Sequence, residues 1–295
     1  MRPIRSLLIY LLVVFLGGAL LAPWLYWAAQ WVAPASLAHS PFHRFVNRSL
    51  LALALAGIWP LLRGLRMKSW RDAGIINPRG QWNQLANGMM LGFGSLACVA
   101  ILILAAQVRR LNLDLAAGTF AAKLAGAAAT AIVVAVLEEL LFRGAIFGAL
   151  RKIWDWRAAL LVSSMIYAIV HFMESAEVTG PVRWSSGLEV LPRMLRGFGD
   201  WDVVIPGFFN LTLAGIMLGL AYQRSGNLYF SIGLHTGWIF WLKSYGLLTT
   251  PLATAHQTFW GTQKLIDGWL AMAVLACALV ALARWPFLKS PETPV

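Results

Sequence analysis

Long apolar stretches separated by short polar segments dominate this sequence. A helix needs about 17 to 25 mostly apolar residues to cross the hydrocarbon core of a bilayer. On that measure the pattern predicts helices near residues 4–25, 49–62, 85–108, 121–150, 158–173, 203–222, 228–248 and 268–283, of which the second is the shortest. The sequence therefore predicts an all-α fold, a polytopic membrane helical bundle of about eight transmembrane helices.

Composition supports the same fold class. Hydrophobic residues make up 59% of the chain and charged residues only 12%, whereas a soluble domain has about 25% charged residues. No segment between the apolar stretches is both long and apolar enough to form a core of its own. The longest, 174–202, is expected to be a surface loop, with an interfacial helix around 188–195 as the alternative.

The distribution of charge predicts the orientation in the membrane. Lys and Arg number 24 against 12 Asp and Glu, a net charge of +12. The segment 63–79 should be cytoplasmic because it carries one acid, Asp72, against five basic residues: Arg63, Arg66, Lys68, Arg71 and Arg79. Eight spans then leave both termini cytoplasmic. The positive charge indicates topology and contact with an anionic lipid bilayer, and no nucleic-acid-binding module accompanies it, so no nucleic-acid partner is expected.

Three charged residues lie close together in the second half of the apolar stretch 121–150. Glu138, Glu139 and Arg143 are costly there, by at least about 2.5 to 3.5 kcal/mol for one charge at the bilayer centre. Glu139 and Arg143 are four residues apart and share a helix face, so they are predicted to pair. Glu138 points about 100° away from Glu139 on a regular helix and is the less neutralised carboxylate. The cluster either has a function or is a group of paired charges that stabilises the fold.

Two histidines also fall within predicted spans. His171 ends the fifth, one turn after Tyr167, and His235 lies in the seventh. An isolated histidine in a span is commonly a hydrogen-bonded packing residue. Counting residues from the cytoplasmic ends, however, brings both histidines and Glu138 to one layer within helix tilt. We expect three helices to contribute one titratable group each to a cavity reached from the cytoplasmic half.

These residues resemble the motifs of a known family. The run from Glu138 to Gly144 is similar to the first motif, E-E-x-x-x-R, of the type II CAAX prenyl endopeptidase and bacteriocin-processing (CPBP) family of intramembrane proteases. Tyr167 to His171 resembles the second motif, F-x-x-x-H, with Tyr in place of Phe. His235 stands where the last motif, H-x-x-x-N, begins, with Ile239 in place of Asn.

The resemblance implies hydrolysis of a peptide bond within the membrane. In the family, the first Glu and the two motif histidines are held to activate a water, which here implies Glu138, His171 and His235, with Glu139 and Arg143 in support. A carboxylate in low-dielectric surroundings can act as a general base near neutral pH, and histidine can position water or protonate the leaving amine. We expect no cofactor. The alternative is zinc held by the same three residues, since two His and one Glu form a catalytic zinc set.

The substitution at Ile239 removes a hydrogen-bond donor from the expected site. Asn210 in the sixth span is the predicted substitute, facing the cavity that holds His235, and the indole of Trp238 is a second candidate. The same substitution raises the alternative of a non-hydrolytic scaffold or immunity-type relative of the family. An ion-coupled transporter would also place charged groups in the membrane, but it commonly shows two similar halves, which this sequence lacks.

The resemblance also suggests how the chain is organised. We predict N-terminal transmembrane helices over 1–120, a catalytic helical core over 121–250, and a C-terminal transmembrane helix with a tail over 251–295. The expected partners are the lipid bilayer and a protein or peptide substrate. Most bacterial-looking members of the family have no prenylated CAAX protein to cut, so the family name assigns neither the substrate nor an oligomeric state. The expected location is a bacterial inner membrane.

Overall fold

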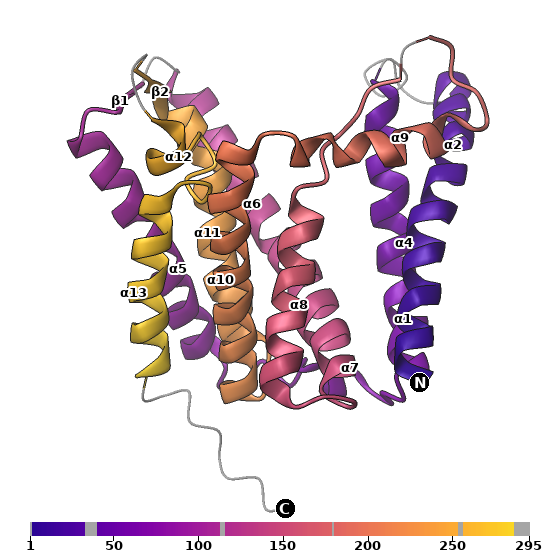
Figure 1. The fold of residues 1–295 in the computed structure, drawn as a ribbon, viewed down its shortest axis with the longest axis horizontal. Coiled ribbons are helices and arrows are strands. Elements are labelled where there is room, and N and C mark those ends of the chain that lie inside the picture. Colours follow the sequence, from indigo (N-terminus) through magenta and orange to yellow (C-terminus); the bar gives the residue numbers. More distant parts are fainter. Residues whose placement is uncertain (1, 33–39, 113–115, 179, 253–255, 286–295) are drawn as a thin grey trace, which may run out of the picture. The chain divides into compact units, whose positions relative to one another are not determined.

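The chain forms two compact helical units. The computed structural model describes residues 2–32, 40–112, 116–178, 180–252 and 256–285. One unit contains Met1–Lys68 and Val170–Asp200, and the larger one contains Ser69–Ile169 and Trp201–Val295. Helices make up most of the described residues (Figure 1), which confirms the all-α prediction. The three-part division at residues 120 and 250 was drawn from motifs and stays a prediction.

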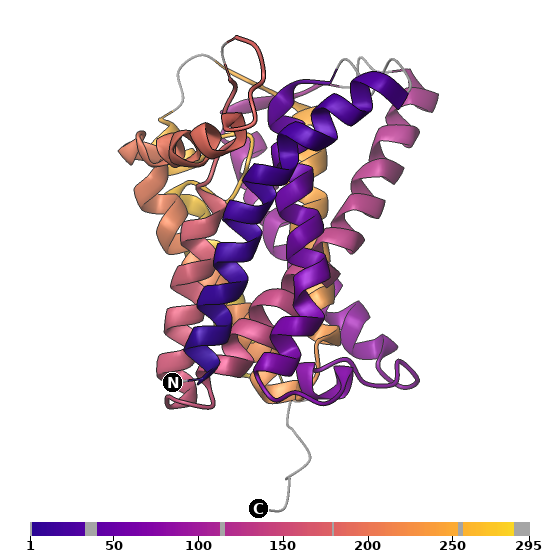
Figure 2. The same cartoon turned by 90° about the vertical axis from the view of Figure 1, so that its right-hand side faces the viewer.

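The smaller unit is built on two long apolar helices. The first consists of α1 (Arg2–Leu12), the π-helical segment η1 (Val13–Gly17) and α2 (Gly18–Val32). It packs beside α4 (Phe42–Gly64), as Figure 2 shows. With 23 residues, α4 is longer than the predicted second span because it begins seven residues before position 49.

The segment 174–202 is more ordered than expected. It contains α9 (Ser186–Arg193) and a 3-10 turn, η4 (Met194–Phe198). Val190 and Met194 are buried in a cluster with Ala22 and Val46 of the long helices. The expectation of an ordinary loop was therefore wrong. Val190 and Met194 are four residues apart, so they share one helix face, which packs on apolar neighbours.

Six helices run alongside one another in the larger unit (Figure 1): α5 (Trp82–Ala105), α6 (Ala117–Glu139), α8 (Trp156–His171), α10 (Trp201–Ser225), α11 (Tyr229–Leu248) and α13 (Trp269–Ala283). The boundary between the units falls inside α8, after Ile169. Short elements connect or extend these helices: η2 (Trp70–Ala73), β1 (Arg109–Leu111), the π-helical η3 (Leu140–Phe147), α7 (Gly148–Leu150), β2 (Thr249–Pro251) and α12 (Gln257–Trp260).

The lengths of the helices suit a membrane protein. Among the described residues, five helical stretches are long and apolar enough to cross a bilayer: Ile4–Val32, Phe42–Gly64, Trp82–Ala105, Ala117–Leu150 and Trp201–Ser225. Two shorter apolar helices, α8 and α13, and the 20-residue α11 correspond to the remaining predicted spans. Together these helices support an integral membrane protein.

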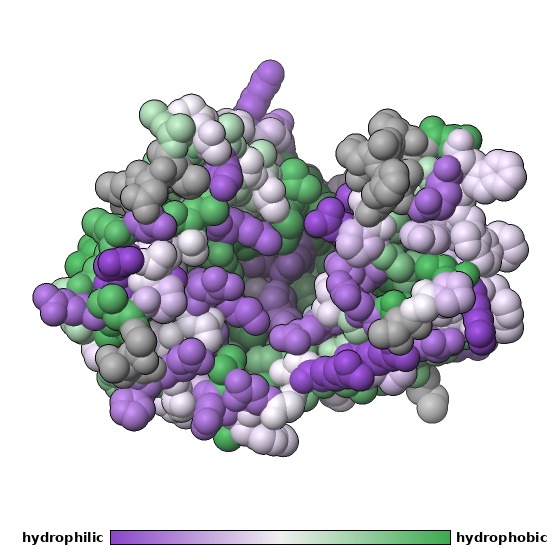
Figure 3. Space-filling model, turned by 90° about the horizontal axis from the view of Figure 1, so that it is seen from above, coloured by the Kyte–Doolittle hydropathy of each residue, from purple (hydrophilic) through white to green (hydrophobic). Residues whose placement is uncertain are grey.

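One end of the larger unit is closed by a pair of short strands. β1 and β2 are antiparallel, with Arg109 opposite Pro251 and Leu111 opposite Thr249. They link the end of α5 to the end of α11. Figure 3 shows hydrophilic side chains gathered at this end, where the apolar helices give way to loops.

The closest helix pair in the larger unit is α5 with α11. A side chain at Gly88 would collide with the backbone carbonyl of Phe230, and one at Gly92 with that of Leu234. Gly233 and Gly237 on α11 face the α5 backbone in the same way. Small residues at this spacing let the two backbones touch. The contact at Gly88 and Gly92 thus sets the position of α11, which carries His235.

Candidate active site

The charged cluster lies where the fourth span changes its helical geometry. α6 ends at Glu139, and the eight residues of η3, which include Arg143, continue it as a π-helix. A π-helix bonds each N–H to the carbonyl five residues back, and such segments are rare and often occur at functional sites. Reasoning from the sequence assumed a regular α-helix here and missed this feature.

Glu139 is the centre of the cluster. Its Oε1 accepts hydrogen bonds from Nη1 of Arg143 at 2.9 Å and from Nδ1 of His235 at 2.9 Å. The side chains of Glu139 and Arg143 are 0% and 3% exposed. Arg143 also donates from Nη2 to the carbonyl of Gly215 on α10 at 3.3 Å. The predicted Glu139–Arg143 pair is thus present, and it joins the fourth span to α10 and α11.

The contact with Glu139 determines which nitrogen of His235 carries the proton. An ionised carboxylate can only accept hydrogen bonds, so Nδ1 must be the donor in the neutral imidazole. Nε2 then has a lone pair and can accept. Two groups face it: the hydroxyl of Tyr167 at 3.2 Å and Oε2 of Glu138 at 3.7 Å.

Glu138 has a different environment from its neighbour. Its side chain is 27% exposed, and its Oε2 lies 3.7 Å from Nε2 of His235, which is longer than a hydrogen bond. Arg143 balances the charge of Glu139. A carboxylate at the edge of a buried, charge-balanced group is well placed to act on a small molecule beside it.

Tyr167 is the residue that sequence reasoning undervalued. It is 3% exposed, its hydroxyl contacts Nε2 of His235, and the Arg143 guanidinium lies 4.7 Å from the centre of its ring. Phe142 packs edge-on against the same ring at 5.0 Å between centroids. The sequence contained one indication of this role: Tyr167 carries a hydroxyl at a motif position where the family has Phe.

The structure brings together four of the six predicted residues: Glu138, Glu139, Arg143 and His235. His171 is the last residue of α8 and is exposed. It stands four residues after Tyr167, so helical spacing puts both on one face of α8. The catalytic role of His171 stays a prediction.

Asn210 has a different partner from the one expected. Its amide donates to the carbonyl of Gly268, at the start of α13, at 2.8 Å. The residue of α10 that is level with Arg143 is Gly215, and Asn210 lies five residues nearer the helix start, about 7.5 Å along the axis. Its amide nitrogen therefore joins α10 to α13, and the expectation that Asn210 faces the cavity holding His235 stays a prediction.

The other predicted donor is also engaged elsewhere. Nε1 of Trp238 donates to the hydroxyl of Ser95 on α5 at 2.9 Å, which makes Trp238 a packing residue. Ile239 is buried against Ala131 and Ala135 of α6. One turn beyond His235, where the motif has Asn, the wall of the site is therefore apolar.

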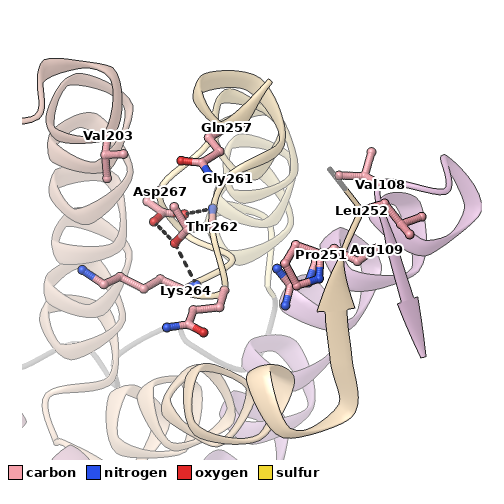
Figure 4. A pocket seen from close by; sticks show the side chains of 11 residues that line it. Val108, Arg109, Val203, Pro251, Leu252, Gln257, Gly261, Thr262, Lys264 and Asp267 are labelled. Carbon is pink, nitrogen blue, oxygen red and sulfur yellow. Dashed lines mark hydrogen bonds between the residues drawn. The ribbon is translucent and has the colours of Figure 1, made fainter. Parts of the chain in front are cut away.

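A separate pocket lies at the strand-bearing end of the larger unit. It has a volume of about 560 Å³ and is lined by residues of the β1, β2 and α12 region, including Arg109, Lys264 and Asp267 (Figure 4). Glu138 and His235 do not line it. Within the described ranges no group of three or more His, Cys, Asp or Glu is arranged to hold a metal ion. The zinc alternative stays a question for experiment.

Comparison with known proteins identifies the segment that contains these residues. Residues 120–241 match the family model described as type II CAAX prenyl endopeptidase Rce1-like. The matched segment includes all three predicted motifs, so the resemblance inferred from them is confirmed. Comparisons with curated proteins and with solved structures found no significant match.

Proposed function

Because residues 120–241 are a type II CAAX prenyl endopeptidase-like segment, we propose that the chain is an intramembrane endopeptidase. Its substrate would be a membrane-associated protein or peptide, cleaved by a water that Glu138 and His235 activate. The family supports a protease-like function in the membrane. The proposal goes further in three details. These are the glutamate–histidine mechanism, the identity of the bond that is cut, and the cytoplasmic orientation of the termini.

The observation that carries the proposal is the separation of 3.7 Å between Oε2 of Glu138 and Nε2 of His235. This distance is too long for a hydrogen bond, but a water about 2.8 Å from each atom would contact both. Glu138 would accept one proton of that water while Nε2 holds the other. A general base must lie within such reach of the proton it removes.

The reaction then follows from the roles of these groups. The water oxygen bonds to the carbonyl carbon, the π electrons of the carbonyl move to its oxygen, and Glu138 takes the water proton. When the tetrahedral intermediate collapses, the carbon–nitrogen bond breaks and the protonated Glu138 returns the proton to the amine. Glu139 stays bonded to Arg143 and keeps His235 in the tautomer that exposes the Nε2 lone pair.

His171 is proposed as the third member of the site. It lies on the face of α8 that carries Tyr167, whose hydroxyl contacts His235. Its imidazole would hold the leaving amine. His171→Ala should therefore lower turnover, while the fold, which depends on the Glu139 contacts, should be retained.

The test compares wild type with Glu138→Gln. Full-length protein would be purified, reconstituted in liposomes and given a pool of internally quenched peptides with apolar segments. Cleavage would be followed by fluorescence and the cut site by mass spectrometry. We expect turnover in wild type and its loss in Glu138→Gln at an unchanged thermal midpoint, since the amide keeps the shape of the side chain but cannot take the proton. Equal rates for the two proteins would refute the proposal.

A second candidate function rests on Ile239. Its burial against Ala131 and Ala135 leaves the motif position without a donor, and a protein that lacks stabilisation of the oxyanion can bind a partner without hydrolysing it. This scaffold function predicts that wild type and Glu138→Gln both retain the peptide and that neither cleaves it.

A further inference from the structure

The ring of Tyr167 makes packing contacts that a phenylalanine could also make. It lies under the Arg143 guanidinium and against Phe142, and both contacts are made by the ring alone. The side chain is buried, so the hydroxyl must have a partner to offset its lost hydration. That partner is Nε2 of His235, the atom that also faces Glu138.

Hydrolysis of a peptide bond needs a donor for the oxyanion that forms on the carbonyl oxygen. Among the described residues, four other donors in or beside the cluster are engaged with fixed acceptors. Arg143 bonds to Glu139 and Gly215, Nδ1 of His235 to Glu139, Trp238 to Ser95, and Thr236 to the carbonyl of Ile232. Ile239 has no polar atom to offer. The Tyr167 hydroxyl differs because its acceptor belongs to the reacting group itself.

We propose that Tyr167 is a catalytic residue whose hydroxyl stabilises the oxyanion, in the position from which Ile239 can offer no hydrogen bond. This inference rests on the proposed endopeptidase function. In the resting site Tyr167 donates to Nε2 of His235. When the substrate carbonyl enters the site, the hydroxyl turns, donates to the carbonyl oxygen and frees Nε2 to hold the water. It stays on that oxygen while the water oxygen bonds to the carbonyl carbon and the carbonyl π electrons move to oxygen.

No proton leaves Tyr167 in this step. The phenol rotates about its carbon–oxygen bond and exchanges one acceptor for another, which a hydroxyl can do without moving the ring. The water proton goes to Glu138 and later to the amine. The lone pair of Nε2, released by the hydroxyl, stays available to the attacking water. The ring contacts with Arg143 and Phe142 hold the oxygen in place during the exchange.

The first test is Tyr167→Phe, measured with the reconstituted protein and the quenched-peptide pool. Loss of one oxyanion donor typically costs about 10² to 10³ in kcat, and we expect this loss with little change in KM. The matched control is Tyr245→Phe, another buried tyrosine of the larger unit, which lies ten residues beyond His235 on α11 and packs against Arg109. The control should keep wild-type turnover.

The second test restores a donor one turn beyond His235. Adding Ile239→Asn to Tyr167→Phe should recover at least about tenfold of the lost kcat, whereas Ile239→Asn alone should change wild type little, because a donor is already present. A gain of about 10² or more in the single Ile239→Asn variant would overturn the inference. This single variant tests it even where Tyr167→Phe folds poorly.

The outcomes separate this inference from the function on which it rests. Active wild type, inactive Glu138→Gln and fully active Tyr167→Phe would overturn only the role of Tyr167. A loss in Tyr167→Phe that Ile239→Asn does not restore would overturn the donor role and would make Tyr167 a positioning residue for His235. Inert wild type would overturn both.

Discussion

Two buried carboxylates of the larger unit, Glu139 and Asp267, are held in opposite ways. Asp267 accepts from the backbone N–H of Thr262 at 2.8 Å and from the hydroxyl of the same residue, five positions earlier in the chain. Glu139 accepts from Arg143 on its own span and from His235, 96 positions away on α11. Both are nearly inaccessible: Asp267 is 4% exposed and Glu139 is 0% exposed. Asp267 closes a loop through neutral partners, whereas Glu139 joins helices through charged or titratable partners.

The difference shows where chemistry is possible in this molecule. Neutral donors such as those of Thr262 fix the shape of a loop, and their protonation does not change in the physiological range. The partners of Glu139 include a histidine whose second nitrogen faces both Tyr167 and Glu138. Buried charge in a membrane helix is costly unless it is paired or used. Glu139 is paired with Arg143 and His235.

The largest expected effect follows from breaking the pair. Arg143→Met leaves the Glu139 carboxylate buried without its positively charged partner. Glu139→Gln leaves the Arg143 guanidinium buried without its negatively charged partner. Removing one partner of a buried ion pair typically destabilises by about 3 to 5 kcal/mol. We expect low yield and a lowered thermal midpoint in detergent for both variants.

Asp267→Asn is the matched control for this prediction. The asparagine oxygen can still accept from Thr262, and a neutral hydrogen bond contributes only about 1 kcal/mol. Normal stability of Arg143→Met, or equal losses in the two regions, would show that the Glu139 pair does not stabilise the fold.

Much of this fold could be predicted from the sequence because its signals are local. Apolar stretches gave the helices, and the four-residue spacing gave the Glu139–Arg143 pair. The start of α4 was placed late because its first turns are polar, with His43, Arg44 and Asn47. The fold of α9 depends on apolar neighbours that come from distant parts of the chain.

The candidate site was predictable in its residues but less so in its connections. Motif spacing found Glu138 and His235, yet the bond from His235 to Glu139 depends on how α11 turns toward α6. The bond from Asn210 to Gly268 was not foreseen, because the sequence does not reveal how α13 packs against α10. Tyr167 was noticed only as a departure from a motif, since a hydroxyl in a sequence does not reveal its acceptor.

The next effect concerns how α11 is positioned. Gly92→Ala should push α11 away from α5, since the added methyl group meets the carbonyl of Leu234, the residue before His235. Overpacking of this kind costs about 1 to 3 kcal/mol, and we expect turnover to fall as well. Gly94→Ala on the same helix meets nothing within 4 Å. Both variants gain the same helix propensity, so the difference in thermal midpoint and kcat isolates the collision. Equal behaviour would contradict the close α5–α11 contact.

A smaller effect is expected from Asn210→Ala. The change removes the hydrogen bond to the Gly268 carbonyl, which should cost about 0.5 to 1.5 kcal/mol of stability. Because this bond joins α10 to α13 away from Arg143, kcat should stay within about twofold of wild type, far below the effect of losing an oxyanion donor. A fall of about 10² in kcat at normal stability would return Asn210 to the active site and remove the distinction between the two regions.

The smallest expected effect is that of removing metal. If Glu138 and His235 act on water directly, dialysis against a strong chelator should leave kcat unchanged, and elemental analysis of active protein should find zinc well below one atom per chain. The reason lies in the partners of His235: Nδ1 is bonded to Glu139, and Nε2 already faces the hydroxyl of Tyr167 at 3.2 Å, where a zinc ligand would need that lone pair for the metal. Loss of activity in chelator that returns with added zinc would contradict the water mechanism. It would also require Tyr167 to move from Nε2, and Tyr167→Phe would then bind zinc at least as tightly as wild type.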